Sequence, residues 1–312
     1  MIKFLLKKIL KPIKNKEKKS RNKFLSKLLN KNKIRLLDIG AAGGIQDIWS
    51  PYQSNIDLVL FEPHIDSFNN LEKKSSKIIN KGFWSEKKIK QSFYQTRKPE
   101  CSGLLQPNLE YLKNFPKADR FEILKTISIE TTTLDTEFDK TNYPHFIKID
   151  TEGAELPILK GGETCLNHTF GLLIECYFFE FHKNQNKFEE VKNYLEKKNI
   201  IFLDFLNMIR WERHKHRFFG QPQASDVLFI VPPEIIIEKY NSKKIDLETL
   251  RIYVSILFIF NRSDLIKVLI NILNNEEKLH LFLDEAYNLT EKKVKQANFV
   301  RKIKRYYFDN FF

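Results

Sequence analysis

The stretch IRLLDIGAAGGIQ, residues 34–46, decides the fold of this chain. A short apolar run that carries Asp38 leads into three glycines, Gly40, Gly43 and Gly44. This order is typical of a parallel strand that is buried on both faces and ends in a tight turn. Because glycine lets another group approach the backbone closely, we expect the turn to present backbone N–H groups and a helix N-terminus to a ligand.

Similar apolar runs recur along the chain, and polar stretches of helical length separate them. The runs are LVLFEP (58–63), HFIKIDTEG (145–153) and GLLIECYF (171–178). This alternation predicts a parallel sheet with crossover helices. Two later runs, IIFLDFL (200–206) and SDVLFIVPP (225–233), are close enough in sequence to pair antiparallel, so we expect an α/β fold with a mixed sheet.

After residue 234 the pattern becomes helical, and Asp246, Ser263 and Thr290 are available as N-caps. We therefore divide the chain into a basic N-terminal arm (1–33), an α/β domain (34–234) and a C-terminal helical region (235–312). The longest apolar run, Ile252 to Phe260, is far shorter than the ~20 residues of a membrane span. Three cysteines without a CxxC pair favour a reducing compartment, and we expect a cytoplasmic protein.

The net charge of +14 is concentrated in the arm. Residues 1–33 carry +12 and the remaining residues only +2. The arm, with apolar side chains such as Phe24 and Leu28 between its lysines, is suited to peripheral contact with the anionic inner surface of a membrane. A solvated, partly helical tail is the alternative. The nearly neutral remainder argues against a nucleic-acid partner.

The glycine spacing excludes two common nucleotide sites. It matches neither the G-x-G-x-x-G dinucleotide fingerprint nor the phosphate-binding loop G-x-x-x-x-G-K-[ST]. Asp38 before the turn and Glu62 after the next strand suit a ligand with ribose hydroxyls and a cationic group, and S-adenosylmethionine has both. The seven histidines show no HExxH or similar grouping, so we expect no metal site.

The blocks LLDIGAAGG, LVLFEPH, ISIETTTLD and above all FIKIDTEGAELPILKGGE resemble the FkbM family of class I methyltransferases. The resemblance implies a Rossmann-like seven-stranded mixed sheet with flanking helices, followed here by the C-terminal helical appendage. It also implies S-adenosylmethionine as the cofactor and a sugar hydroxyl as the acceptor. Ala42 departs from the family, which usually has asparagine there. The cofactor contacts implied by the resemblance are Asp38, Gly40, Ala41, Gly44 and Glu62. In the segment NKGFWS (80–85), the resemblance implies that Phe83 or Trp84 stacks on the adenine ring, with core packing as the alternative for Trp84.

An enzyme that methylates a hydroxyl positions the acceptor and takes up its proton. We expect the proton acceptor among Asp150, Glu152 and Glu175, which follow or end two central strands. Alternatively, Asp150 pairs with Lys148 to hold its strand. The segment from Arg210 to Gln223 is expected to connect two strands, and its Trp211 and His214 are candidate acceptor contacts. A solvated hairpin is the alternative there.

The sequence thus predicts an S-adenosylmethionine-dependent O-methyltransferase that acts on a small-molecule or glycan acceptor. The alternative from a different class is a non-catalytic protein of the same fold that serves as a scaffold in a glycan-assembly complex. An RNA methyltransferase is disfavoured by the low charge of residues 34–312.

Overall fold

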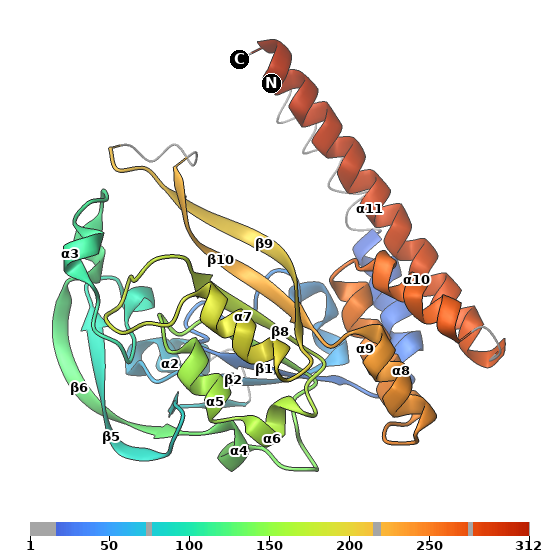
Figure 1. The fold of residues 1–312 in the computed structure, drawn as a ribbon, viewed down its shortest axis with the longest axis horizontal. Coiled ribbons are helices and arrows are strands. Elements are labelled where there is room, and N and C mark those ends of the chain that lie inside the picture. The colour runs from blue at the N-terminus through green and yellow to red at the C-terminus, as the bar shows by residue number, and fades with distance from the viewer. Residues whose placement is uncertain (1–16, 73–76, 215–219, 274–276, 312) are drawn as a thin grey trace. The chain divides into compact units, whose positions relative to one another are not determined.

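The computed structural model describes residues 17–72, 77–214, 220–273 and 277–311 and consists of two compact units (Figure 1). The first, the sheet unit, comprises residues 34–46 and 56–232. The second, the helical unit, comprises the described residues of 1–33, 47–55 and 233–312. The segment that follows the glycine turn, residues 47–55, therefore belongs to the helical unit.

The main sheet has seven strands within the described residues: β1 (Ile34–Ile39), β2 (Ile56–Phe61), β3 (Ile78–Ile79), β7 (Phe146–Ile149), β8 (Gly171–Tyr177), β9 (Ile201–Trp211) and β10 (Gln221–Ile230). Their order is β3-β2-β1-β7-β8-β10-β9. The first five run parallel, whereas β10 is antiparallel to both of its neighbours. This order confirms the predicted mixed seven-stranded sheet, and it brings the carboxyl ends of β1, β2, β7 and β8 to one edge.

A second, three-stranded sheet was not predicted. It consists of β4 (Gly82–Phe83), β6 (Ile123–Thr132) and β5 (Lys88–Thr96), with β6 in the middle. The long β5 and β6 curve together at one side of the sheet unit in Figure 1. Between them lie the short helices η2 (Pro99–Cys101), α3 (Leu109–Leu112) and η3 (Ala118–Phe121).

The remaining helices of the sheet unit are α2 (Ile65–Glu72), α4 (Leu134–Glu137), α5 (Glu155–Lys160), α6 (Glu163–Leu166) and α7 (Phe188–Glu196). Helices α5 and α7 pack against each other and against β8, and α7 also contacts β9 (Figure 1). These contacts bury the apolar side chains Ile158, Leu159 and Leu195. The predicted arrangement of helices on a largely parallel sheet is confirmed.

The predicted antiparallel pairing of the two late runs is confirmed by β9 and β10. The predicted connection over residues 210–223 was too long, because Arg210 and Trp211 end β9 while residues 221–223 begin β10. Its basic side chains indicated a loop. Within β10, Pro222 lies beside a register shift in the pairing, where a strand tolerates proline.

The helical unit contains a helix over residues 17–29, η1 (Ser50–Asn55), α8 (Pro233–Asn241), α9 (Leu247–Ile259), α10 (Ser263–Ile272) and α11 (Glu277–Phe311). The expected C-terminal helices are therefore present. Asp246 caps α9 as predicted, because its carboxylate accepts from the Thr249 backbone N–H at 2.8 Å. The two other predicted caps were wrong. Arg262, not Ser263, holds the N-cap position of α10, and Thr290 lies inside α11 with its hydroxyl bonded to the Ala286 carbonyl.

The apolar side chains in the second half of the basic arm face the core of the helical unit. Phe24, Leu25, Leu28 and Leu29 are all buried. Arg21 is buried as well, and its guanidinium donates to the Phe258 carbonyl at 2.7 Å. The expectation that Phe24 and Leu28 face a membrane or solvent was therefore wrong. Residues 1–16 lie outside the described residues.

No helix in the described ranges combines the length and the apolar character that a bilayer crossing requires.

We expected a ligand to approach the backbone of the glycine turn at Gly40, but the chain after β7 approaches it there. A Cβ atom on Gly40 would lie 1.8 Å from the backbone oxygen of Asp150, and the φ of Gly40 is +78°. Gly40 and Ala41 donate their N–H groups to the Phe61 carbonyl, and no helix follows over residues 41–49. Gly40 is thus required by the chain after β7, whereas Gly43 has no atom within 4 Å of a built Cβ.

We predict that Gly40→Ala lowers the free energy of unfolding by at least about 1–2 kcal/mol, because alanine disfavours positive φ and its Cβ would overlap the Asp150 carbonyl. Urea denaturation of the full chain measures this loss. Gly43→Ala is the matched control and should stay within about 0.5 kcal/mol of the wild type. Equal losses in the two variants would contradict this account of the turn.

Candidate functional site

The carboxyl ends of β1 and β7 are joined by a buried ammonium group. Lys148 of β7 lies opposite Asp38 of β1, and its Nζ is 3.1 Å from the Asp38 carboxylate. The same Nζ is 3.3 Å from the Asp150 carboxylate and donates to the Gly40 carbonyl at 3.0 Å. Both readings of Asp150, a site residue and a partner of Lys148, are therefore compatible with the geometry.

Burial and ion pairing have opposite effects on the pKa values of this group. Burial disfavours the charged lysine, but the carboxylates of Asp150 and Asp38 outweigh it and hold the pKa of Lys148 above its usual value. Burial also raises the pKa of Asp38, while Lys148 acts in the opposite direction. We favour the ionised pair, because the ammonium has three oxygen atoms around it. The side chain of Asp150 is 37% exposed, compared with 4% for Asp38, so Asp150 is the member that a ligand can reach.

Beside this group lies a cavity of about 320 Å³, within the size range of ligand sites in proteins. The glycine turn forms one wall, and residues 62–64, 81–83 and 150–152 form others. The predicted site residues that line it are Gly40, Gly44, Glu62, Phe83, Asp150 and Glu152. The predicted residues that do not line it are Asp38, Ala41, Trp84, Glu175, Trp211 and His214.

Glu62 stands directly after β2 and lines the cavity. Its carboxylate accepts from the His64 backbone N–H at 2.8 Å and from that of Ala42. Burial nevertheless raises the pKa of Glu62 to about 7, and the two backbone donors only limit the shift. The carboxylate is thus fixed in direction and close to its titration point at neutral pH.

The loop after β7 is held by an acid that the prediction did not include. Glu155, at the start of α5, accepts from the backbone N–H groups of Thr151 and Gly153 at 3.1 and 3.2 Å. Between these residues, Glu152 has a φ of +56°, which is unusual for a residue with a side chain. Glu155 thus stabilises a strained loop that presents Glu152 to the cavity.

Glu152 and Glu175 share one donor, the hydroxyl group of Tyr177. The Tyr177 oxygen lies 2.9 Å from Glu152 Oε2 and 2.6 Å from Glu175 Oε2. Burial raises the pKa of both carboxyl groups. Charge repulsion from Asp150 raises both further, and repulsion from Glu152 also raises the pKa of Glu175. The prediction selected both acids, but it did not include the tyrosine that joins them.

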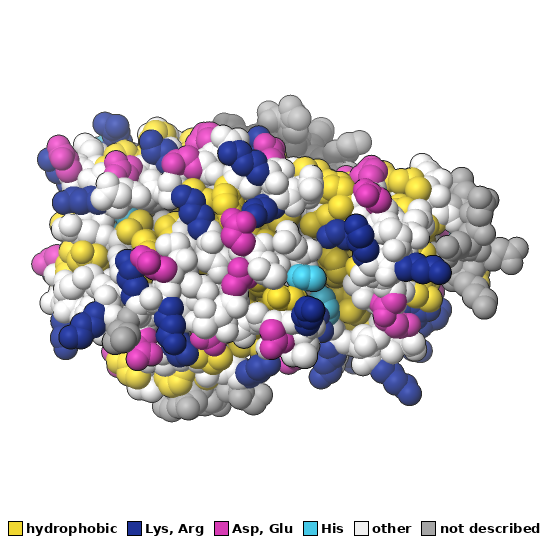
Figure 2. All heavy atoms as spheres, turned by 60° about the horizontal axis from the view of Figure 1, so that its bottom comes forward, with side chains coloured by type: hydrophobic (Ala, Val, Ile, Leu, Met, Phe, Trp, Pro, Cys, Tyr) yellow, Lys and Arg dark blue, Asp and Glu magenta, His cyan; other side chains and the backbone are white. Residues whose placement is uncertain are grey.

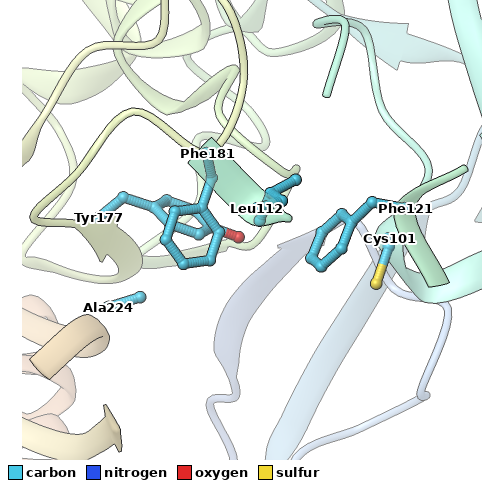
Figure 3. Packing of buried hydrophobic residues seen from close by; sticks show 6 residues of the cluster. All are labelled: Cys101, Leu112, Phe121, Tyr177, Phe181 and Ala224. Carbon is cyan, nitrogen blue, oxygen red and sulfur yellow. The ribbon is translucent and has the colours of Figure 1, made fainter. Parts of the chain in front are cut away.

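Tyr177 also belongs to an aromatic cluster (Figure 3). Its ring packs against Phe181 at 4.9 Å between centroids, and Cys101 lies beside Phe121. The buried members are Cys101, Leu112, Phe121, Tyr177, Phe181 and Ala224. Partly buried aromatic residues, Trp211 among them, surround these side chains. The cluster therefore connects β8 and β10 with the short helices that follow β5.

The two predicted acceptor contacts lie in different surroundings. Trp211 packs 4.9 Å from Phe181 between centroids, and the Arg120 guanidinium stacks on its ring at 4.2 Å. His214 is exposed on the connection after β9. A role for either residue in acceptor binding stays a prediction.

The two predicted adenine neighbours also differ. Phe83 is buried in contact with Phe61, with centroids 4.5 Å apart, and it lines the cavity. Trp84 is half-buried, and its backbone N–H donates to the Thr132 carbonyl. Ala41 is buried against Leu60 and Leu71.

Sequence reasoning missed His64 and Phe93, which also line the cavity and lie with their rings 6.2 Å apart. His64 was visible in the block LVLFEPH. Phe93 comes from the unpredicted second sheet, so no sequence signal linked it to the turn. Across the described ranges no group of three histidine, cysteine or acidic side chains is arranged to hold a metal ion.

Comparison with known proteins agrees with the resemblance. Residues 38–202, more than half of the chain, match the Methyltransferase FkbM domain. A comparison with curated proteins gave no match.

Among solved structures, the chain is similar to an S-adenosylmethionine-dependent methyltransferase from Archaeoglobus fulgidus (14% identity, 64% of this chain and 87% of that chain covered, TM-score 0.31). It is also similar to TrmK of M. capricolum in complex with S-adenosyl-homocysteine (12% identity, 87% and 96% covered, TM-score 0.30). TM-scores this low support no conclusion about the site. The family match shows that this chain belongs to the FkbM methyltransferase family and is an S-adenosylmethionine-dependent methyltransferase.

Proposed function

We propose that this protein is an O-methyltransferase that transfers the methyl group of S-adenosylmethionine to a hydroxyl of a sugar, a glycan or a related polar acceptor. The observation that carries the proposal is the Glu152 carboxyl group. It lines the cavity beside the glycine turn, and no ammonium or guanidinium group lies within ion-pairing distance of it among the described residues. An acid in this state is suited to take a proton from a hydroxyl.

The cavity residues suit the cofactor. Four acids line the cavity, namely Glu62, Glu100, Asp150 and Glu152. The two lysines that line it, Lys81 and Lys148, are already paired with carboxylates. A surplus of carboxylates favours a cationic ligand over a phosphate. The open space at Gly43 leaves the turn accessible to a ligand.

We assign the cofactor contacts as follows. Glu62 accepts hydrogen bonds from the ribose hydroxyls, and the backbone of Gly40 and Gly44 forms the adjoining wall. Phe83 flanks the adenine ring, with Trp84 as the less favoured alternative because it does not line the cavity. Asp38 and Ala41 do not line the cavity. We assign them indirect roles: Asp38 holds Lys148 by an ion pair, and Ala41 packs beneath the glycine turn. S-adenosylmethionine, when bound, supplies a methyl group on a sulfonium centre.

An RNA acceptor is less well supported. On the face shown in Figure 2, basic and acidic side chains are interspersed, and no continuous basic field is visible. Residues 34–312 carry a net charge of only +2. Proteins that bind nucleic acids usually gather lysine and arginine on one face.

The first test is methyl transfer from S-adenosylmethionine labelled in its methyl group to a panel of free monosaccharides and nucleotide sugars. We expect labelled methyl ether to form on at least one sugar, and a heat-treated sample is the control. If the protein binds S-adenosyl-homocysteine but labels no sugar of the panel, the proposed sugar O-methylation is overturned.

The second test concerns Glu62 and pH. The ionised carboxylate accepts hydrogen bonds and the protonated one accepts them poorly. The affinity for S-adenosyl-homocysteine should therefore fall as the pH drops below the pKa of about 7, by up to about tenfold per pH unit. In Glu62→Gln this part of the pH dependence should vanish, and Glu62→Ala should weaken binding by about 1–3 kcal/mol. Calorimetry between pH 5.5 and 8.5 measures all three proteins, and identical slopes in wild type and Glu62→Gln would contradict the assignment.

We further propose that the division into residues 1–33, 34–234 and 235–312 reflects separate roles, with the arm contacting an anionic membrane surface. Since Phe24 and Leu28 are buried, the contact is assigned to residues 1–16, which hold six lysines and no acid. Each basic residue near such a surface contributes about 1 kcal/mol.

Removal of residues 1–16 should accordingly reduce sedimentation with phosphatidylserine vesicles at low salt and leave S-adenosyl-homocysteine affinity unchanged. Neutral phosphatidylcholine vesicles are the control. Equal sedimentation of both proteins with the anionic vesicles would contradict the proposed contact.

A further inference from the structure

Three acids at the carboxyl ends of β7 and β8 were equivalent candidates for the proton acceptor, and their contacts differ. Asp150 is paired with Lys148 at 3.3 Å. In the described part of the chain no ammonium or guanidinium group pairs with Glu152 or Glu175, and both acids meet at the Tyr177 hydroxyl. The difference makes it possible to assign separate roles to the three acids.

We propose that Glu175 keeps a proton in the resting protein and donates it in a hydrogen bond to the Tyr177 oxygen, while the Tyr177 hydroxyl donates to ionised Glu152, the group that takes the acceptor proton. Glu152 is then the catalytic base, and Tyr177 and Glu175 are positioning residues. This inference rests on the proposed function, because it concerns the proton of the acceptor hydroxyl.

The count of hydrogen atoms requires such an extra proton. A tyrosine hydroxyl has one hydrogen atom and can donate it to one oxygen at a time. Two ionised carboxylates at 2.9 and 2.6 Å from the same oxygen would leave one close oxygen pair without a hydrogen atom between them. With one carboxyl protonated, each contact contains one donor and one acceptor.

The surroundings decide which carboxyl holds the proton. Glu152 has a cation among its electrostatic neighbours, Arg120, which stabilises the ionised form. The neighbours that most affect Glu175 are other acids and the tyrosine. The titratable groups that face Glu152 are those of Asp150, Glu155, Arg120, Tyr177 and His182. Those that face Glu175 are Asp150, Glu152, Glu155, Tyr177 and Asp226, which lies opposite Glu175 on the neighbouring strand β10.

His182 does not supply a further positive charge. Its ring is fully buried, with Nε2 3.7 Å from Glu152 Oε2, and burial lowers its pKa to about 4. With a neutral imidazole, Glu152 has no cation at ion-pairing distance among the described residues, and only the charge of Arg120 favours its ionised form. The carboxylate therefore retains a high proton affinity, as a base working near neutral pH requires.

In the transfer step, the acceptor oxygen forms a bond to the methyl carbon and the carbon–sulfur bond breaks with its electron pair left on sulfur. The hydroxyl proton passes to Glu152, so charge and atoms balance. Tyr177 keeps the receiving carboxylate fixed in direction, and Glu175 prevents the tyrosine hydroxyl from turning away from it.

The test is a carboxyl titration by carbon-13 NMR on protein labelled at the glutamate side-chain carboxyl carbon, in complex with S-adenosyl-homocysteine. Glu152→Gln and Glu175→Gln assign the two resonances. Between pH 5 and 9 we expect Glu152 to release its proton first and Glu175 last. The reverse order, or release by both groups below pH 6, would overturn the assignment. The titration needs no acceptor, so it tests the proton assignment even if no sugar is methylated. A failure to methylate any sugar would overturn the proposed function but not this assignment.

A second variant covers the case in which either glutamine variant does not fold. In Tyr177→Phe the ionised Glu152 loses its donor, so its titration should move to higher pH. Tyr111→Phe is the matched control, because the Tyr111 hydroxyl donates at 2.6 Å to the Gln223 amide oxygen and not to an acid. No shift in Tyr177→Phe, or an equal shift in both variants, would overturn the proposal.

Activity distinguishes the roles once a sugar acceptor from the panel is found. Glu175→Leu should lower turnover, and Glu175→Gln should lower it less, because the glutamine amide can still donate to the Tyr177 oxygen as a protonated carboxyl does. Glu152→Gln should keep S-adenosyl-homocysteine affinity within a few fold and lower turnover by about 10²–10⁴. An active Glu152→Gln with an inactive Glu175→Gln would overturn the assignment.

Discussion

The site depends on one buried ammonium group. Lys148 lies in a strand with no exposed residue, and it contacts Asp38, Asp150 and the Gly40 carbonyl at the same time. The contact therefore ties the end of β1 to the loop after β7, where the glycine turn and the acidic loop meet. A charge buried this deeply is stable only with such partners, so the turn and the loop have to be placed together.

This constraint gives the neighbouring acids different properties. Asp150 is paired with the buried ammonium group of Lys148, whereas no ammonium or guanidinium group of the described residues lies at ion-pairing distance from Glu152 or Glu175. Glu155 holds the loop through backbone N–H groups and keeps Glu152 in a strained conformation. Four carboxyl groups of the same chemical type thus become an ion-pair partner, a loop support and two members of a proton-sharing network.

Much of the fold was predictable, because strands buried on both faces have a strong pattern. The apolar runs around Leu37, Leu60 and Ile147 predicted the parallel strands at the centre of the sheet. The two runs within residues 200–233 predicted the antiparallel pair at its edge. The second sheet was missed because β6 is only partly buried, and its alternation of exposed and half-buried residues is weak. The predicted N-cap at Thr290 was wrong because α11 begins before this residue and continues past it.

The sequence by itself determined the order of the strands' apolar runs, the acids at their ends and membership of a methyltransferase family. Its blocks placed Glu62, Asp150 and Glu152 near the glycine turn correctly, because parallel strands end at one edge. Only the tertiary structure decided that Gly40 accommodates the Asp150 carbonyl, and that Tyr177 joins Glu152 to Glu175. These contacts depend on distances of a few ångströms between segments far apart in the chain, which residue type and spacing do not specify.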